Sequence, residues 1–100
     1  MRGVVISLIL ATSAVAEDCR VLVEGAGCRT RQLAIQRIWE AMLTVSEVEI
    51  LPRSAAPADN HRYFIVRSEE TAPNRKQLIE ALGRRAKHYK VKTVEPVTPE

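Results

Sequence analysis

Aromatic side chains are scarce in this sequence, since one phenylalanine, one tryptophan and two tyrosines make up only 4% of its 100 residues. Modules that bind single-stranded nucleic acid stack bases on aromatic side chains, and the glycine-and-aromatic strand signature of an RNA-recognition module is also missing. The net charge of +3 is too small to indicate a partner by itself. We therefore expect no nucleic acid among the partners of this protein.

Signatures of catalysis are missing as well. The sequence has no nucleophile elbow, no phosphate-binding loop, no dinucleotide fingerprint and no Ser-His-Asp order at a recognisable spacing. The two histidines, His61 and His88, are isolated along the chain, and a solvated surface position is expected for each. We therefore expect that the protein is not an enzyme.

No apolar run in the sequence reaches the length of about 20 residues that a membrane-spanning helix needs. Near the N-terminus, Arg2 precedes a shorter apolar run that grades into small residues and ends with the triplet Ala-Val-Ala at Ala16. This is the layout of a secretory signal peptide. We expect residues 1–16 to be cleaved and residues 17–100 to form one periplasmic or extracellular domain with a short proline-containing C-terminal tail.

Cysteine occurs only twice, at Cys19 and Cys28. In an oxidising compartment the two could form a disulfide, but the valine-rich run Arg20–Glu24 between them predicts a strand. Such a strand would hold the two α-carbons on the order of 20 Å apart, whereas a disulfide requires them within about 7 Å. We therefore expect no disulfide between them, and each thiol to be free, bound to metal or paired with another chain.

Hydrophobic spacing predicts the order strand, helix, strand, strand, helix, strand. With right-handed crossovers this order predicts an α+β, ferredoxin-like β-α-β-β-α-β sandwich, in which a four-stranded antiparallel sheet carries two helices on one face. The expected ranges are a strand over Arg20–Glu24, a helix from an N-cap at Thr30 to about Val45, a strand over Val48–Pro52, a strand over residues 61–69, a helix over residues 71–89 and a strand over residues 91–95.

Two local patterns sharpen this prediction. Asn74, followed three residues later by Gln77, resembles a capping box at the start of the second helix. In the third strand the alternation places Tyr63 and Ile65 on one face, and the residues that follow each of them, Phe64 and Val66, on the other.

A glycine-rich loop, Gly25 to Cys28, separates the first expected strand from the first expected helix. Together with the leucine-isoleucine helix and the valine-rich strand near the C-terminus, it resembles the heavy-metal-associated domain of copper chaperones and metal-pumping ATPases. The loop of that family reads Gly-Met-x-Cys-x-x-Cys. Gly25 and Cys28 match its glycine and first cysteine, whereas Ala26 replaces the methionine and Arg31 occupies the position of the second cysteine.

The resemblance implies that Cys28 is a ligand for a soft metal ion of the copper class, on a loop shaped by Gly25 and Gly27. One thiolate does not hold Cu(I) alone, so a second thiolate would come from a partner protein or from a second copy of this chain. A homodimer through Cys28 or through a shared metal ion is therefore expected.

Four further residues are expected near this loop. Arg29 and Arg31 lie close to Cys28 in sequence, and positive charge at a helix start favours the thiolate form of a cysteine. The family architecture also brings the turn before the last strand, with His88 and Tyr89, beside the metal loop.

A basic run near the C-terminus is the other candidate site. It could bind acidic protein or an anionic membrane surface, or it could be the solvated end of a helix. The sequence thus leaves two functions open: an exported soft-metal carrier, and a metal-free protein-interaction module or accessory subunit of an envelope complex. The cationic residues of the run are Arg84, Arg85, Lys87, Lys90 and Lys92.

Overall fold

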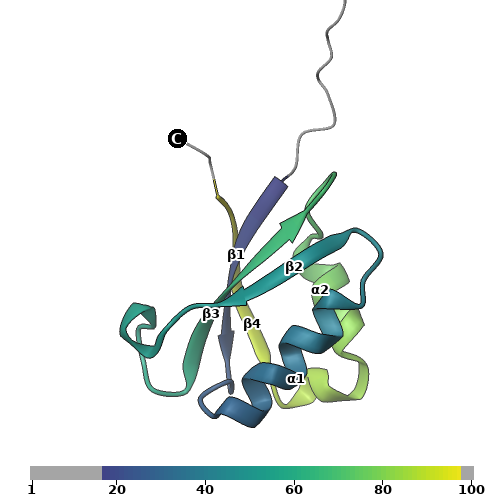
Figure 1. Cartoon of the computed structure of the whole chain (residues 1–100). Helices are drawn as coiled ribbons and strands as arrows, with labels where there is room; N and C mark the ends of the chain where they lie inside the picture. The colour runs from purple at the N-terminus through teal and green to yellow at the C-terminus, as the bar shows by residue number, and fades with distance from the viewer. Residues whose placement is uncertain (1–16, 98–100) are drawn as a thin grey trace, which may run out of the picture.

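Strands and helices alternate along residues 17–97, the part of the chain that the computed structural model describes (Figure 1). The leader expected over residues 1–16 lies outside these described residues. The elements in chain order are β1 (Glu17–Glu24), α1 (Arg29–Glu40), β2 (Val45–Ile50), the 3-10 helix η2 (Arg53–Ala55), β3 (His61–Ser68), α2 (Arg75–Leu82), the 3-10 helix η3 (Gly83–Lys87) and β4 (Lys90–Val97).

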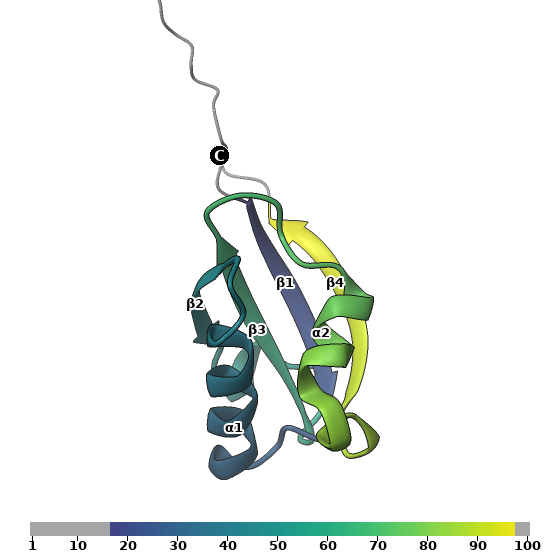
Figure 2. The same ribbon diagram turned by 90° about the vertical axis from the view of Figure 1, so that its right-hand side faces the viewer.

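The four strands form one antiparallel sheet in the order β2-β3-β1-β4. The two crossovers carry α1 and α2 to the same face of this sheet, and the other face bears no helix within the described residues (Figure 2). This architecture is the ferredoxin-like β-α-β-β-α-β sandwich, and it confirms the fold class predicted from the sequence.

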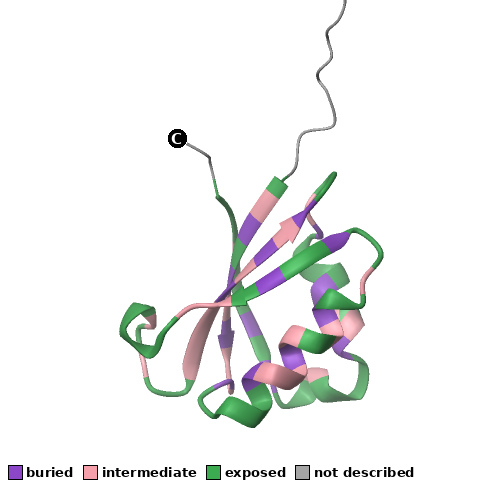
Figure 3. Ribbon diagram, in the orientation of Figure 1, coloured by how far each residue is buried: buried purple, intermediate pink, exposed green. Residues whose placement is uncertain are grey.

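Alternation along the two central strands sets the core. Val21 and Val23 of β1 are fully buried beneath the helices, as are Phe64 and Val66 of β3, and Val21 lies directly opposite Phe64 (Figure 3). Tyr63, which precedes Phe64, and Ile65, which lies between Phe64 and Val66, are only half-buried. The predicted division of β3 into two faces is therefore confirmed.

β1 and β4 extend beyond the ranges predicted from their apolar residues, whereas β2 ends at Ile50 rather than Pro52 and β3 ends at Ser68, one residue before its predicted end. β1 begins at Glu17 rather than Arg20 because its polar start pairs with the end of β3, where Glu17 lies opposite Ser68. β4 continues through Pro96 to Val97. A proline is tolerated there because β4 is an edge strand, whose outward amides need no partner in the sheet.

The first helix is shorter than predicted at its C-terminal end. It ends at Glu40, and Val45, which was expected to continue its apolar stripe, begins β2 opposite Ser68. A turn between them is closed by the Val45 amide, which donates to the carbonyl of Met42 at 3.1 Å. The helical spacing of Val45 was misleading because a buried strand position also requires a valine.

The second helix is shorter than predicted at both ends, since it begins at Arg75 rather than residue 71, but its predicted Asn74 cap is present. The Asn74 side chain accepts from the Gln77 amide, and the Gln77 side chain accepts from the Asn74 amide, each at 2.9 Å, so the capping box is confirmed. Gly83 ends the helix with a φ of +59°, and η3 replaces the expected continuation to Tyr89. Glycine is suited to this position because residues with a side chain rarely adopt positive φ.

Trp39 lies at the centre of the core and contacts β3 through an edge-on arrangement with Phe64, whose ring centroid is 5.4 Å away. Within residues 17–97 we find no helix with the length and apolar character needed to span a bilayer. The buried apolar residues are Cys19, Val21, Val23, Ala26, Ile35, Trp39, Val45, Val48, Phe64, Val66, Leu78, Leu82, Tyr89 and Val91.

Candidate functional site

The loop between β1 and α1 is held from one side by the turn before β4. Gly25 has a φ of +97°, and a β-carbon at this position would lie 2.5 Å from the main-chain carbonyl oxygen of His88. No side chain fits there, so glycine is required by both conformation and space. The turn before β4 thus lies beside the glycine loop, as the family architecture implies.

The loop between β2 and β3 holds the same segment from the other side. The amides of Gly25 and Ala26 both donate to the carbonyl oxygen of Asn60, at 2.7 and 3.1 Å. A β-carbon on Gly27 would lie 2.9 Å from the carbonyl oxygen of Asp59. This contact could not be predicted from the sequence, because Asn60 meets the glycine loop only when β3 pairs with β1.

Cys28 is the N-cap of α1, in place of Thr30. Its backbone is extended, with φ −112° and ψ 156°, and its carbonyl oxygen accepts from the Gln32 amide at 3.0 Å to close the first helical turn. Thr30 is therefore already inside the helix, and its predicted capping role is wrong. The Cys28 side chain is exposed and makes no capping hydrogen bond, so its sulfur lies at the surface.

Arg31, at the position of the missing second cysteine, folds back on the loop. Its Nη1 donates to the carbonyl oxygen of Gly25 over a long 3.4 Å. The neighbouring Gln32 is buried, and its Nε2 donates to the carbonyl oxygen of Ala26 at 3.0 Å. These bonds stabilise the path of the loop backbone and provide no ligand for a metal. Arg29 is exposed at the first position of α1.

His88 and Tyr89 lie beside the loop through their backbone, whereas their side chains differ in exposure. Tyr89 is buried, His88 is exposed, and the two rings meet edge-on with centroids 6.5 Å apart. Within residues 17–97, no three His, Cys, Asp or Glu side chains are grouped closely enough to hold a metal ion. The described residues of a single chain therefore supply Cys28 as a lone exposed thiol.

The second thiol, Cys19, belongs to the core. It lies on the buried face of β1 and is 3% exposed, and neither cysteine is in a disulfide, as expected. Burial raises the pKa of the Cys19 thiol to about 11, and the adjacent Asp18 carboxylate contributes to the shift. Cys19 is thus a protonated packing residue at neutral pH.

The predicted basic run forms an exposed surface on η3 and β4. Residues 75–92 contain seven lysines and arginines but one acidic residue, Glu80, whereas the net charge of the whole chain is only +3. Within the described part of the chain, only Lys92 among these seven cations forms an ion pair, with its Nζ 3.5 Å from Glu24 Oε1. We use the name cationic face for the exposed cations of α2, η3 and the start of β4, which are Arg75, Lys76, Arg84, Arg85, Lys87, Lys90 and Lys92.

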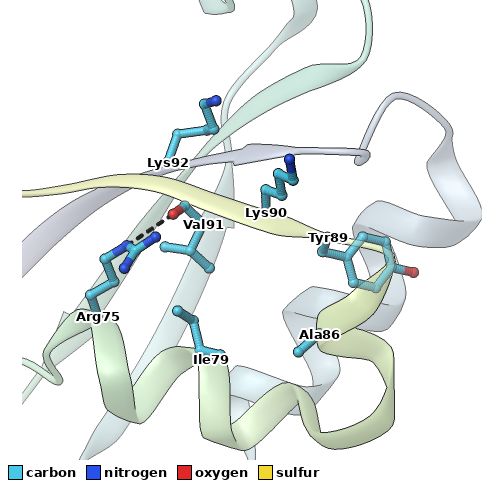
Figure 4. Close-up of a pocket in the computed structure, with 7 residues that line it drawn as sticks. All are labelled: Arg75, Ile79, Ala86, Tyr89, Lys90, Val91 and Lys92. Carbon is cyan, nitrogen blue, oxygen red and sulfur yellow. Dashed lines mark hydrogen bonds between the residues drawn. The ribbon is translucent and has the colours of Figure 1, made fainter.

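A groove of about 350 Å³ lies along the cationic face between α2, η3 and β4 (Figure 4). At one end the Nε of Arg75 donates to the main-chain carbonyl of Val91 at 3.0 Å. Neither Arg75 nor Ile79 was predicted to belong to a site, because only the packing of α2 beside β4 brings them to this groove. The lining residues are Arg75, Ile79, Ala86, Tyr89, Lys90, Val91 and Lys92.

A scan against protein-family models finds no match to this chain, and a search of curated proteins finds no significant relative. The resemblance to the heavy-metal-associated domain therefore depends on the Gly25–Cys28 loop and on the order of the elements.

Proposed function

We propose that this protein is a non-catalytic binding module that recognises an acidic segment of a partner protein through its cationic face. The observation that carries this proposal is the concentration of positive charge in residues 75–92, beside a groove that is lined by cations together with apolar side chains such as Ile79 and Ala86. Cations gathered around a groove favour carboxylates over neutral side chains and accelerate association with an acidic partner.

On the open face of the sheet, in contrast to the cationic face, Arg20 and Arg67 are neutralised by nearby carboxylates. Arg67 lies 3.0 Å from a carboxylate oxygen of Asp18 and 2.5 Å from one of Glu49. Arg20 pairs with Glu95 at 2.8 Å, and its guanidinium lies 4.8 Å from the ring centroid of Tyr63. These ion pairs reduce the positive potential that Arg20 and Arg67 would offer to phosphates, which favours a protein partner over nucleic acid.

The leader expected over residues 1–16 places this module in the periplasm or outside the cell. In that setting the partner is a component of an envelope complex, and this chain is its accessory subunit.

Binding of a fluorescein-labelled oligoglutamate peptide to the full-length chain tests this proposal. Charge reversal in the double variant Arg84→Glu/Arg85→Glu is expected to weaken binding by about tenfold or more at low salt. A matched control, Arg29→Glu/Arg37→Glu, changes the net charge equally on α1, where these exposed arginines make no ion pair within residues 17–97. The control is expected to change affinity by less than about threefold.

Equal weakening in both double variants would show a response to net charge alone and would contradict the cationic face as the binding site. An absence of binding by the unmodified chain would overturn the proposed function. Binding to phosphatidylserine-containing vesicles without binding to the peptide would overturn the acidic protein partner and indicate that the cationic face binds a membrane surface.

The exposed thiol of Cys28 supports a second candidate, in which Cu(I) is shared between this chain and a thiolate of a partner or second copy. The sulfur makes no hydrogen bond at the helix start, and the loop backbone is fixed on both sides by Asn60 and His88. Two thiolates from two chains would complete the nearly linear site that Cu(I) accepts.

Anaerobic titration of the reduced chain with Cu(I) against a competing chelator, beside Cys28→Ser, tests this candidate. A shared site predicts tight binding at one Cu(I) per two chains, accompanied by dimer formation. Absence of tight binding, or binding that the serine variant retains, would exclude it.

A further inference from the structure

The two edges of the sheet differ in how their outward backbone groups are satisfied. On the β2 edge, two side chains of α1 take the place of a neighbouring strand. Gln36 Nε2 donates to the carbonyl oxygen of Val48 at 2.8 Å, and the Val48 amide donates to Glu40 Oε2 at 3.1 Å. The β2 edge is also irregular, with a register shift between Val45 and Glu47. This edge is therefore closed to another strand.

The β4 edge is the open one. Within residues 17–97, a single side-chain hydrogen bond reaches the backbone of β4: Arg75 Nε donates to the Val91 carbonyl. Pro96 lies opposite Cys19 of β1. Because proline has no amide hydrogen to donate to β1, it occupies a non-hydrogen-bonded position, at which the backbone groups point away from β1. By the two-residue alternation, the amide and carbonyl of Val94 face outward as well.

The groove lies along the first part of this open edge. Figure 4 shows Arg75 and Ile79 of α2 and Ala86 of η3 directed toward β4, with the Arg75 guanidinium at the Val91 carbonyl. Lys90 and Lys92 line the same groove from the strand. An extended chain alongside β4 would thus meet apolar contacts, cations and unpaired backbone groups together.

We propose that an extended acidic segment of the partner adds to the outer edge of β4 as a fifth strand. This inference rests on the proposed function and specifies how the partner binds. A carboxylate of the segment binds the Arg75 guanidinium and displaces it from the Val91 carbonyl. That carbonyl then accepts a hydrogen bond from a backbone amide of the segment. Backbone hydrogen bonds then fix the register, and the alternate acidic side chains meet Lys90 and Lys92.

A second copy of this chain fits the β4 edge less well than an acidic partner does. Its own β2 edge is closed by Gln36 and Glu40. Pairing of two β4 strands through the segment beside the groove would place Lys90 of one copy opposite Lys92 of the other, and like charges directly opposite each other are destabilising. Charge complementarity therefore selects a segment rich in glutamate or aspartate.

Backbone methylation of a probe peptide tests strand addition while leaving charge unchanged. The probe is a labelled ten-residue peptide of alternating valine and glutamate, measured with the full-length chain. Two derivatives carry N-methyl groups on the amides of odd or of even residues, which face opposite edges of an extended peptide. Strand addition predicts that one derivative loses affinity by about tenfold or more, while the other binds within about threefold of the parent.

The variant Arg75→Gln is expected to weaken binding of the parent peptide by about fivefold. Its control is Lys76→Gln, which removes the same charge at the next residue. The control is expected to have a smaller effect because Lys76 does not line the groove. Amide hydrogen exchange at Val94 is expected to slow on addition of the peptide. This readout distinguishes backbone pairing from charge attraction, which does not protect an amide.

Equal affinity of the two methylated derivatives would overturn strand addition, and the proposed function would stand if oligoglutamate still binds to the cationic face. Loss of all binding to acidic peptides would overturn both. Self-association of the chain without peptide, with slowed hydrogen exchange at the Val94 amide, would contradict a partner strand and indicate that a second copy of the chain pairs with β4.

Discussion

The indole Nε1 of Trp39 on α1 donates a hydrogen bond to the main-chain carbonyl oxygen of Leu78 on α2, at 3.1 Å. Both residues are completely buried, and the Trp39 ring also meets Phe64 of β3 edge-on. One side chain therefore joins both helices to the sheet. This contact stabilises the helix layer that positions α2, and with it the groove along β4.

Replacement of Trp39 by phenylalanine is expected to lower the free energy of unfolding by about 2–3 kcal/mol, because it removes a buried donor and leaves part of the ring volume empty. Urea denaturation followed by far-UV circular dichroism measures this loss without the tryptophan signal. A decrease below about 0.5 kcal/mol would show that the hydrogen bond to Leu78 and the packing contribute little.

Substitution of Gly25 by alanine is expected to cost about 2–4 kcal/mol of unfolding free energy, because the φ of +97° disfavours a side chain and the β-carbon would meet the His88 carbonyl oxygen. Gly83 is the matched control, since its φ is +59° but no atom lies within 4 Å of the added β-carbon. Gly83→Ala is expected to cost about 1–3 kcal/mol, because only its backbone conformation, with φ +59° and ψ −127°, opposes a side chain. Chemical denaturation of both variants compares the two, and equal costs would contradict the steric contribution at Gly25.

Ionisation of Cys19 is expected to destabilise the fold at alkaline pH. Because burial raises the folded-state pKa from 9.0 to about 11, the folded chain retains a proton that the unfolded chain loses in this interval. The stabilisation is complete below pH 9 and is lost as the pH rises to about 11, by about 2–3 kcal/mol. Urea denaturation across this range measures it.

Cys19→Ala is the control for that pH dependence. The variant is less stable at neutral pH because it leaves a cavity, but its unfolding free energy is expected to fall less between pH 9 and 11. An identical pH dependence in both proteins would contradict the raised pKa of Cys19.

Substitution of Ser68 by alanine is expected to leave stability unchanged or to raise it by about 1 kcal/mol, because an unpaired hydroxyl is costly to bury. The Ser68 Oγ is buried without a hydrogen-bond partner within the described residues. Ser46 is the comparison, since its exposed hydroxyl donates to the Arg67 carbonyl at 3.1 Å. Ser46→Ala is expected to cost about 0.5 kcal/mol, and thermal melting of both variants measures the difference. Destabilisation by Ser68→Ala would indicate a partner for its hydroxyl.

Several parts of the fold could be predicted from neighbouring residues alone. The capping box of Asn74 and Gln77 and the two faces of β3 follow from short-range spacing, and both are present. The ends of α1 and α2 were misplaced because Val45 satisfies helical and strand spacing alike and because the role of Gly83 depends on its φ. The lengths of β1 and β4 were underestimated because polar residues such as Glu17 join the sheet only through their partners.

The candidate sites divide in the same way. Gly25 and Cys28 were identified from the loop sequence, and the structure explains why Gly25 has no side chain. The lysines and arginines of the basic run were evident from composition. Arg75 was missed because its relation to Val91 exists only between a helix and a strand that are separate in sequence.

The sequence by itself determined the order of the elements, the apolar faces of the central strands and the concentration of cations in residues 75–92. These properties depend on spacing and composition, which folding does not change. Only the tertiary structure decided that Cys28 begins α1 as an exposed thiol, that α1 closes the β2 edge at Val48, and that the β4 edge stays open beside a groove. The physical reason is that a backbone amide or carbonyl is satisfied by whichever group packing brings to it, often from a distant part of the chain.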